Sequence, residues 1–484
     1  MKAKIPASVE DARILKVARR WLPTIEQLQA FQRLSNCCCS RCCAKWRRFW
    51  VVLRRVLILV DICTLLQHNL DLTLRMMRKF ISYLSLLCPL IGIGQTYVPP
   101  NEGPWETVDI TESLGWCPDR LDSLDAFMEA NGTRGLIILH EGLIAHEAYF
   151  NGGGMDSLWY WASAGKTVTS ALIGILASEE LLNIEDATAD WLGEGWTSMP
   201  PEDEYNISIV NQLTMTTGLD DSAGDPDCTL PDCLHYLEPP GVRWAYHNAP
   251  YTLLTDVIST AAGQPLNIVF FNRIRQHLGM TANYINFPSE PFNKVVVSTA
   301  RDMARFGLLA SRNFVWNGDS LITNAGYLSD VFNSTQPFNA CYGSLWWLNG
   351  GATHMLPQTQ WVFDGAIVPS GPIDLRMALG KNDQKIHISP SSGLVLIRMG
   401  ESAGVSALAA SSLDDQIWTH LNLMTLGCAN CIYDMNNDGL VAVGDILLFL
   451  STFGIGESPA DFNSDGTTTT ADLLAILGAF GSTC

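Results

Sequence analysis

The sequence predicts an α/β domain built on an antiparallel sheet flanked by helices, with a helical lobe inserted into it, followed by a small α-helical module. Three observations predict this arrangement. Apolar residues alternate near both ends of residues 95–426, helical periodicity dominates between these ends, and short Asp-, Asn- and Gly-rich repeats follow Cys428. Strands at both ends with helices between them indicate one sheet that is completed by both termini.

The 484 residues carry 30 Lys and Arg against 49 Asp and Glu, for a formal net charge of −19. The charge is unevenly distributed, because residues 1–94 have a net charge of +11 and residues 95–484 one of −30. A field of that sign repels DNA and RNA, so the acidic part excludes a nucleic-acid partner. A chain of this length predicts two or three folded units.

A candidate signal peptide lies at residues 77–94. Arg78 and Lys79 precede an apolar run, and small residues stand before Gln95. These are the three parts of a secretory signal peptide, and the run is too short to span a bilayer. We therefore expect export through this segment, cleavage before Gln95 and a secreted or cell-surface protein. The alternative is a short, buried core segment.

Residues 1–76 are rich in Arg and contain a cluster of cysteines. Since a signal peptide stands at the start of a chain, translation from Met76 or Met77 is the simplest explanation for this segment. The alternative is a basic extension that binds a membrane surface. The expected boundaries are therefore 1–76, 77–94, 95–426 and 427–484.

The stretch from 95 to 426 is long enough for one large domain or for a domain of two lobes. Its apolar residues alternate in 136–150 and again in 385–400, as they do in strands. The segments 163–180 and 249–263 instead repeat their apolar residues at helical spacing.

A Ser-x-x-Lys pair marks the start of the first of these helices. Ser163 falls at the N-terminus of the helix, and Lys166 lies one turn later on the same face. Backbone N–H groups at a helix N-terminus favour negative charge, and a neighbouring amine can remove the hydroxyl proton. Ser163 is therefore a candidate nucleophile. The alternative is a capping serine followed by a solvated lysine.

A Tyr-x-Asn pattern begins at three positions, Tyr149, Tyr246 and Tyr284. The first lies in a predicted strand before the candidate nucleophile, and the last follows a loop late in the domain. Only Tyr246 lies in the helical middle, just before a new helix. Its position therefore selects Tyr246 and Asn248 as partners of the nucleophile.

Six motifs follow one another between residues 105 and 420. They are WASAGKTVTSALIGI around Ser163, LTMTTGLD at 213–220, WAYHN at 244–248, QHLGM at 276–280, STARDMARFGLLA at 298–310 and YGSLWWLNGG at 342–351. In this order they resemble the penicillin-recognising serine hydrolases. The resemblance is strongest to the class C beta-lactamase-related branch, which includes esterases and 6-aminohexanoate-oligomer hydrolases. It implies a serine beta-lactamase-like fold.

The resemblance also implies a role for each matching residue. Ser163 would be the acylated nucleophile, and Lys166 and Tyr246 would form the acid/base pair that carries its proton. Asn248 would orient the substrate. No cofactor is expected for catalysis.

The third motif of the family, K-T-G or H-T-G on a strand, is missing in strict form. The segment Gly380-Lys-Asn-Asp-Gln384 stands in its place. We expect Lys381 and Gln384 to bind the substrate, and one oxyanion donor to come from the backbone near Asp383–Gln384. The other donor would be the N–H of Ser163.

Seven cysteines follow residue 94, and an odd number leaves at least one thiol free or paired outside the chain. Cys228 and Cys233 share the short loop DPDCTLPDC. Secretion would place them in an oxidising compartment, so a disulfide between them is expected.

Two loops in the C-terminal part place oxygen ligands at positions 1, 3, 5 and 12, a Gly at position 6 and a backbone carbonyl at position 7. This is an arrangement that Ca²⁺ prefers. The first loop supplies Asp434, Asn436, Asp438, Leu440 and Asp445, and the second supplies Asp461, Asn463, Asp465, Thr467 and Asp472. A chance Asx-rich turn is the alternative for one loop, but two in tandem favour calcium.

An apolar segment with the spacing of a short helix follows each loop. The tandem pattern resembles a type I dockerin over residues 431–481, including Asp rather than Glu at position 12. The resemblance implies anchoring to a cohesin on a scaffold or cell surface. The alternative is that the module only stabilises the chain.

Together these observations predict a secreted serine hydrolase that cleaves an ester or amide bond in a small or peptide-like substrate. A catalytically silent binding protein of the same fold is the alternative from another class. Among enzymes, beta-lactamase or D,D-peptidase activity is less favoured because the third motif is eroded.

Overall fold

The computed structural model describes residues 97–404, 410–425, 432–436, 438–455, 458–463 and 465–482. The expectations for residues 1–76 and for the signal peptide at 77–94 lie outside these residues. The chain divides into two compact units, Met1–Gly92 and Ile93–Cys484, and the second contains every element described below. Within the described residues, no helix combines the length and the apolar character needed to cross a bilayer.

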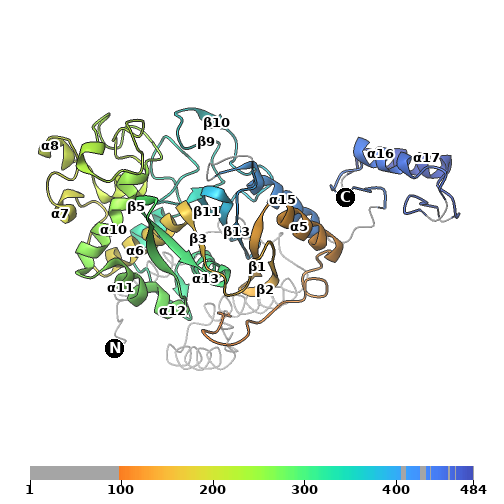
Figure 1. Ribbon diagram of the computed structural model, residues 1–484, viewed down its shortest axis with the longest axis horizontal. Helices are drawn as coiled ribbons and strands as arrows, with labels where there is room; N and C mark the ends of the chain where they lie inside the picture. The colour runs from red at the N-terminus through yellow and green to blue at the C-terminus, as the bar shows by residue number, and fades with distance from the viewer. Residues whose placement is uncertain are drawn as a thin grey trace, which may run out of the picture. The chain divides into compact units, whose positions relative to one another are not determined.

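The central layer is an antiparallel sheet of six strands in the order β2-β1-β13-β12-β11-β8 (Figure 1). The first strands of the domain lie beside the last, because β1 pairs with β13 along its whole length. The expectation that both termini complete one sheet is therefore confirmed. The strands are β1 Thr133–His140, β2 Leu143–Tyr149, β8 Trp347–Leu348, β11 Arg376–Gly380, β12 Gln384–Ser389 and β13 Leu394–Gly400.

A smaller sheet in the order β3-β5-β4 supports the start of helix α6. Two short hairpins, β6–β7 and β9–β10, complete the strands of the described residues. Their bounds are β3 Trp159–Tyr160, β4 Asn283–Phe287, β5 Glu290–Ser298, β6 Val315–Trp316, β7 Asp319–Ser320, β9 Thr353–Met355 and β10 Val362–Asp364.

Helices cover both faces of the central sheet. On one face, α13 approaches so closely that a Cβ on Gly307 would lie 2.7 Å from Val395 and 3.1 Å from Ile386. On the other face, Trp418 of α15 donates a hydrogen bond to His387 over 3.1 Å. Ile386 and His387 are neighbours in β12 and therefore point to opposite faces. The helices here are α5 Pro118–Ala130, α13 Ala300–Ser311 and α15 Ser412–Thr425.

The middle of the chain forms the predicted helical lobe (Figure 1). Its longest helices, α6 and α10, match the two segments with helical spacing, and α6 is buried along almost its whole length. The lobe therefore packs around α6 rather than beside it. Its helices are α6 Lys166–Ser178, α7 Ala189–Leu192, α8 Pro201–Glu204, α9 Ile209–Leu213, α10 Asn248–Ala262, α11 Leu266–Phe270, α12 Gln276–Leu278 and α14 Ala325–Asp330.

The C-terminal part contains α16 Val443–Ser451 and α17 Thr470–Gly478. Each is the helix that the sequence predicts after one of the Asp-rich loops. The two pack around a core of four buried residues, Val441, Phe449, Ala460 and Ile476. So few buried side chains give this part little hydrophobic stabilisation of its own.

Candidate active site

The candidate nucleophile lies in a tight turn that leads into α6. Ser163 belongs to a 3₁₀ turn at Ala162–Gly165, and Lys166 is the first residue of the α-helix. Ala162 has a left-handed φ of 48°, which is costly for a residue with a Cβ. The backbone N–H of Trp161 bonds to Val296 of β5 over 2.8 Å and holds the turn in place. The sequence-predicted helix N-terminus is therefore a strained turn, a common feature of functional sites.

Lys166 reaches from the helix to the hydroxyl of Ser163. Its Nζ lies 3.0 Å from Ser163 Oγ and 2.8 Å from Asn248 Oδ1, and it sits 3.8 Å from the ring centre of Tyr251. Burial lowers the pKa of Lys166 to about 7, although the charge of Asp227 acts in the opposite direction. Much of this lysine is therefore a neutral amine near pH 7, and a neutral amine can accept the serine proton.

Tyr246 approaches the same hydroxyl from the start of α10. Burial raises the pKa of Tyr246 above its usual value, while its hydrogen bond with Ser163 acts to lower it. The Nζ of Lys166 lies 5.0 Å from the Tyr246 ring centre. The phenol therefore keeps its proton at neutral pH and is suited to donate it. The two partners of Ser163 thus have opposite roles, one accepting and one donating.

The four residues predicted as catalytic line one cavity of about 360 Å³. Lys381 also lines it, as the sequence predicts for a substrate-binding residue. Two loops and strand β5 form further walls of the cavity. The lining residues are Asp221, Pro226 and Asp227 in one loop, Pro357 and Gln358 in the other, and Asn293, Lys294 and Val295 in β5.

Two further residues of the site, Tyr251 and Asp227, are not predicted by the sequence patterns. Tyr251 follows Asn248 by three residues on α10, so helical spacing could have placed it beside Lys166. The position of Asp227 depends on the fold of its loop, and no local pattern indicates it.

The expectation that Gln384 binds substrate is wrong, because this residue lies outside the cavity. Its side chain is fully buried and donates to the carbonyls of Asn382 and Gly400, each over 2.7 Å. Asn382 and Asp383 both have left-handed φ values, 58° and 60°. This turn directs Gln384 into the sheet, where it fixes the turn that carries Lys381.

Cys228 and Cys233 form the disulfide that the sequence predicts. Cys117 is also disulfide-bonded, and Cys341 is a buried free thiol. The disulfide therefore closes a short turn, residues 228–233, directly after the cavity residue Asp227.

The Asp-rich loops of the C-terminal part bring carboxylates together. Asp434, Asp438 and Asp445 each offer an oxygen, and these oxygens lie within 4.8 Å of one another. Asp434 accepts hydrogen bonds from the backbone of Asp438 and Gly439. The second loop repeats this pattern, with Asp461 accepting from Asp465 and Gly466. Of the remaining predicted ligands, Asn436, Leu440, Asn463 and Thr467 lie in the same two loops, and Asp472 lies in the first turn of α17.

Comparison with known families agrees with the motif order. The family model described as beta-lactamase matches residues 123–368, which is more than half of the chain. The chain belongs to the beta-lactamase family. It is a serine hydrolase, and the family match contains Ser163, Lys166, Tyr246 and Asn248. A search of curated proteins gave no match.

Two solved structures have the same fold. One, from Bacillus anthracis, is provisionally named a 6-aminohexanoate-dimer hydrolase; it is 20% identical, with a TM-score of 0.50, over 68% of this chain and 90% of that one. The other, from Bacteroides dorei DSM 17855, is provisionally named a beta-lactamase; it is 15% identical, with a TM-score of 0.50, over 64% of this chain and 99% of that one. At these identities the likeness concerns the fold alone.

Proposed function

We propose that this serine hydrolase cleaves an ester or amide bond through an acyl-enzyme on Ser163. The observation that carries the proposal is the 3.0 Å contact of Ser163 Oγ with Lys166 Nζ, in the wall of a cavity with room for a small substrate. A hydroxyl beside a buried amine with a pKa of about 7 is an activated nucleophile.

In acylation, the neutral amine of Lys166 accepts the proton of Ser163 as Oγ attacks the substrate carbonyl. The hydrogen bond from Lys166 to Asn248 Oδ1 holds the amine in place during this step. The phenol of Tyr246 donates its proton to the departing alcohol or amine, and the Lys166 ammonium returns the proton to Tyr246. The products of this step are the acyl-enzyme and the neutral leaving group.

In deacylation, the same pair acts on water. Lys166 and Tyr246 together remove a proton from a water molecule as its oxygen attacks the acyl carbon, and the proton returns to Ser163 Oγ as the ester bond breaks. The products are the free serine and a carboxylic acid.

The negative charge of each tetrahedral intermediate needs backbone donors. The N–H of Ser163 supplies one. The end of β11 approaches the nucleophile turn so closely that a Cβ on Gly380 would lie 2.3 Å from the carbonyl oxygen of Trp161. We assign the second donor to the backbone at Gly380–Lys381, in place of the expected Asp383–Gln384, because Lys381 lines the cavity and Asp383 and Gln384 do not.

A hydrolysis assay on the full chain tests this proposal. We expect turnover of p-nitrophenyl esters with a burst of about one p-nitrophenol per protein when deacylation is slow. Ser163→Ala should abolish both the turnover and the burst. Ser329→Ala, at an exposed serine of α14, should leave both unchanged. Turnover by Ser163→Ala would contradict the proposal. Faster cleavage of nitrocefin than of any ester or amide would favour the beta-lactamase alternative.

We further propose that the protein is secreted and that the C-terminal loops bind Ca²⁺. The clustered carboxylate oxygens of Asp434, Asp438 and Asp445 fit a hard cation. A disulfide in the hydrolase domain supports an oxidising compartment. The exposed Leu447 on α16 and the exposed Leu474 on α17 support docking to a cohesin-type partner. Co-precipitation with a cohesin domain, with and without calcium, tests this part.

A further inference from the structure

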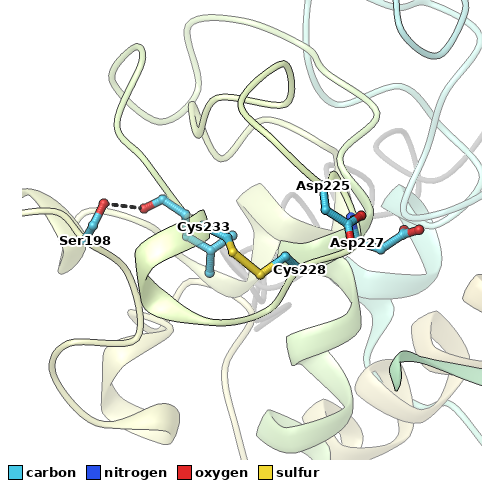
Figure 2. Close-up of a disulfide and its surroundings, with 6 residues drawn as sticks. Ser198, Asp225, Asp227, Cys228 and Cys233 are labelled. Atoms are coloured by element: carbon cyan, nitrogen blue, oxygen red, sulfur yellow. Dashed lines mark hydrogen bonds between the residues drawn. A yellow bond between two sulfur atoms is a disulfide. The ribbon is translucent and has the colours of Figure 1, made fainter. Parts of the chain in front are cut away.

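The loop that carries Asp227 is fixed at three points. The backbone N–H of Asp227 bonds to the Asp225 carboxylate over 3.0 Å. The carbonyl of Pro226 accepts a 3.0 Å bond from the backbone of Ala249 in α10. The Cys228–Cys233 disulfide follows directly, and Figure 2 shows it beside Asp225 and Asp227. Asp227 is therefore held against the helix that also supplies Asn248.

The carboxylate of Asp227 forms no salt bridge with any described residue, although its charge raises the pKa of Lys166. It lines the cavity, and its Oδ1 is buried without a hydrogen-bond partner. The other cavity carboxylate, Asp221, is paired with Arg243 over 2.8 Å. Lys294, on another wall, is paired with Asp256. Asp227 is thus the carboxylate of this cavity that lacks a partner in the described part of the chain.

Lys166 lies close enough to feel the charge of Asp227 but forms no salt bridge with it. Its Nζ contacts Ser163 Oγ and Asn248 Oδ1, and no ion pair joins it to Asp227. A buried carboxylate oxygen without a hydrogen bond costs free energy, which a cation in the cavity would recover. The bond from Ala249 to Pro226 holds this part of the loop against α10. The arrangement is that of a pre-positioned site for a positive charge.

We propose that Asp227 binds a cationic ammonium group of the substrate and so determines specificity. The inference rests on the proposed function, because the cation would lie in the same cavity as the bond that Ser163 attacks. The chemical class is an ester or amide that carries a positive charge on its acyl part or on its leaving group.

Matched substrate pairs test this inference on the full chain. Each pair contains an ester that ends in a primary ammonium group and its neutral isostere that ends in a methyl group. One pair carries the group on the acyl part and the other on the leaving group. We expect kcat/KM to favour the cationic member of at least one pair by about tenfold or more, the range for a bond to a charged group.

Variants separate recognition from catalysis. Asp227→Asn should reduce the preference to about one, and Asp232→Asn should keep it, because Asp232 is an exposed carboxylate of the same disulfide loop. High salt should weaken the preference. A wild-type preference below twofold in both pairs would overturn the inference. The inference would also be overturned if the Asp227→Asn variant kept the preference for the cationic ester. The same holds if this variant lost activity equally on the cationic ester and on its neutral isostere.

A binding measurement separates this inference from the proposed function. The Ser163→Ala variant should bind the preferred cationic ester about tenfold more tightly than its isostere in calorimetry, and adding Asp227→Asn should remove the difference. This result would support the cation site even if wild-type protein cleaved neither ester. Cleavage of both esters at equal rates with equal binding would overturn the cation site and leave the hydrolase proposal intact.

Discussion

At the scale of residues, burial gives the two partners of Ser163 different tasks. Lys166 and Tyr246 are both buried, and burial disfavours the charged form of each. For the lysine the neutral form is a base, and for the tyrosine the neutral form is an acid. The desolvated cavity wall therefore prepares one proton acceptor and one proton donor at the same hydroxyl.

The rate should depend on the protonation of Lys166. Its pKa of about 7 predicts that kcat/KM for a neutral ester rises about tenfold per pH unit below 7 and levels off above it. Asp227 raises the pKa of Lys166, so Asp227→Asn should move this inflection to lower pH. A pH–rate profile of both proteins measures this. An inflection near 10 would show that Lys166 titrates as an ordinary lysine and would contradict its role as the base.

The sequence predicts the catalytic residues well because their spacing is local. Ser163 and Lys166 share one turn of chain, and Tyr246 and Asn248 flank the start of one helix. Asp227 was missed, because only the folded, disulfide-closed loop brings it to the cavity. The prediction for Gln384 was wrong because the left-handed turn before it directs its side chain into the sheet. The order of motifs along the chain does not reveal such a turn.

At the scale of elements, the contact of β11 with the nucleophile turn determines the geometry of the site. The strand ends at Gly380, where a Cβ would lie 2.3 Å from the Trp161 carbonyl oxygen and 3.0 Å from the Ala164 nitrogen. Any side chain here must push the turn away from the strand. The absence of a side chain at Gly380 therefore lets the end of β11 lie directly against the turn that carries Ser163, where a second backbone donor for the oxyanion is needed.

Gly380→Ala should lower kcat by about 100-fold, because small misplacements of catalytic groups cost about that much. Gly154→Ala is a matched control, since a Cβ there would make only an ordinary contact, 3.5 Å from Ser157. Steady-state kinetics and a thermal melt of both variants measure the effect. Full activity in a folded Gly380→Ala protein would show that this contact does not position the site.

The elements themselves were largely predictable. Helical spacing identified α6 and α10, and alternation identified β1, β2, β12 and β13. The short strands β3 and β8 and the helices α7 to α9 were not predicted, since two to five residues give too few repeats of either period. Tertiary contacts fix these short elements, such as the bond from Trp161 to Val296.

At the scale of the whole molecule, the two folded parts differ in what stabilises them. The hydrolase domain has a large continuous core, whereas the C-terminal part buries four hydrophobic residues in its own core. Its clustered carboxylates repel one another, and among the described residues a salt bridge reaches only Asp434, from Arg120 over 2.9 Å. The C-terminal part therefore depends on metal binding for its stability, if the loops bind Ca²⁺ as proposed.

Calorimetric titration of the full chain with Ca²⁺ should give about two sites. Asp434→Ala should remove one of them, and the exposed Asp364→Ala should remove none. Removing calcium with a chelator should reduce the helical signal of the C-terminal part while leaving ester hydrolysis unchanged. A titration without heat or a change in helicity would contradict the calcium proposal.

The most direct test of the account is labelling of the full chain by a fluorophosphonate probe, followed by mass mapping of the adduct. We expect one adduct, on Ser163, that forms faster as the pH rises through about 7 and is absent in Ser163→Ala. Well-folded protein that takes up no probe, or that takes it up at another serine, would contradict the claim that Ser163 is the activated nucleophile.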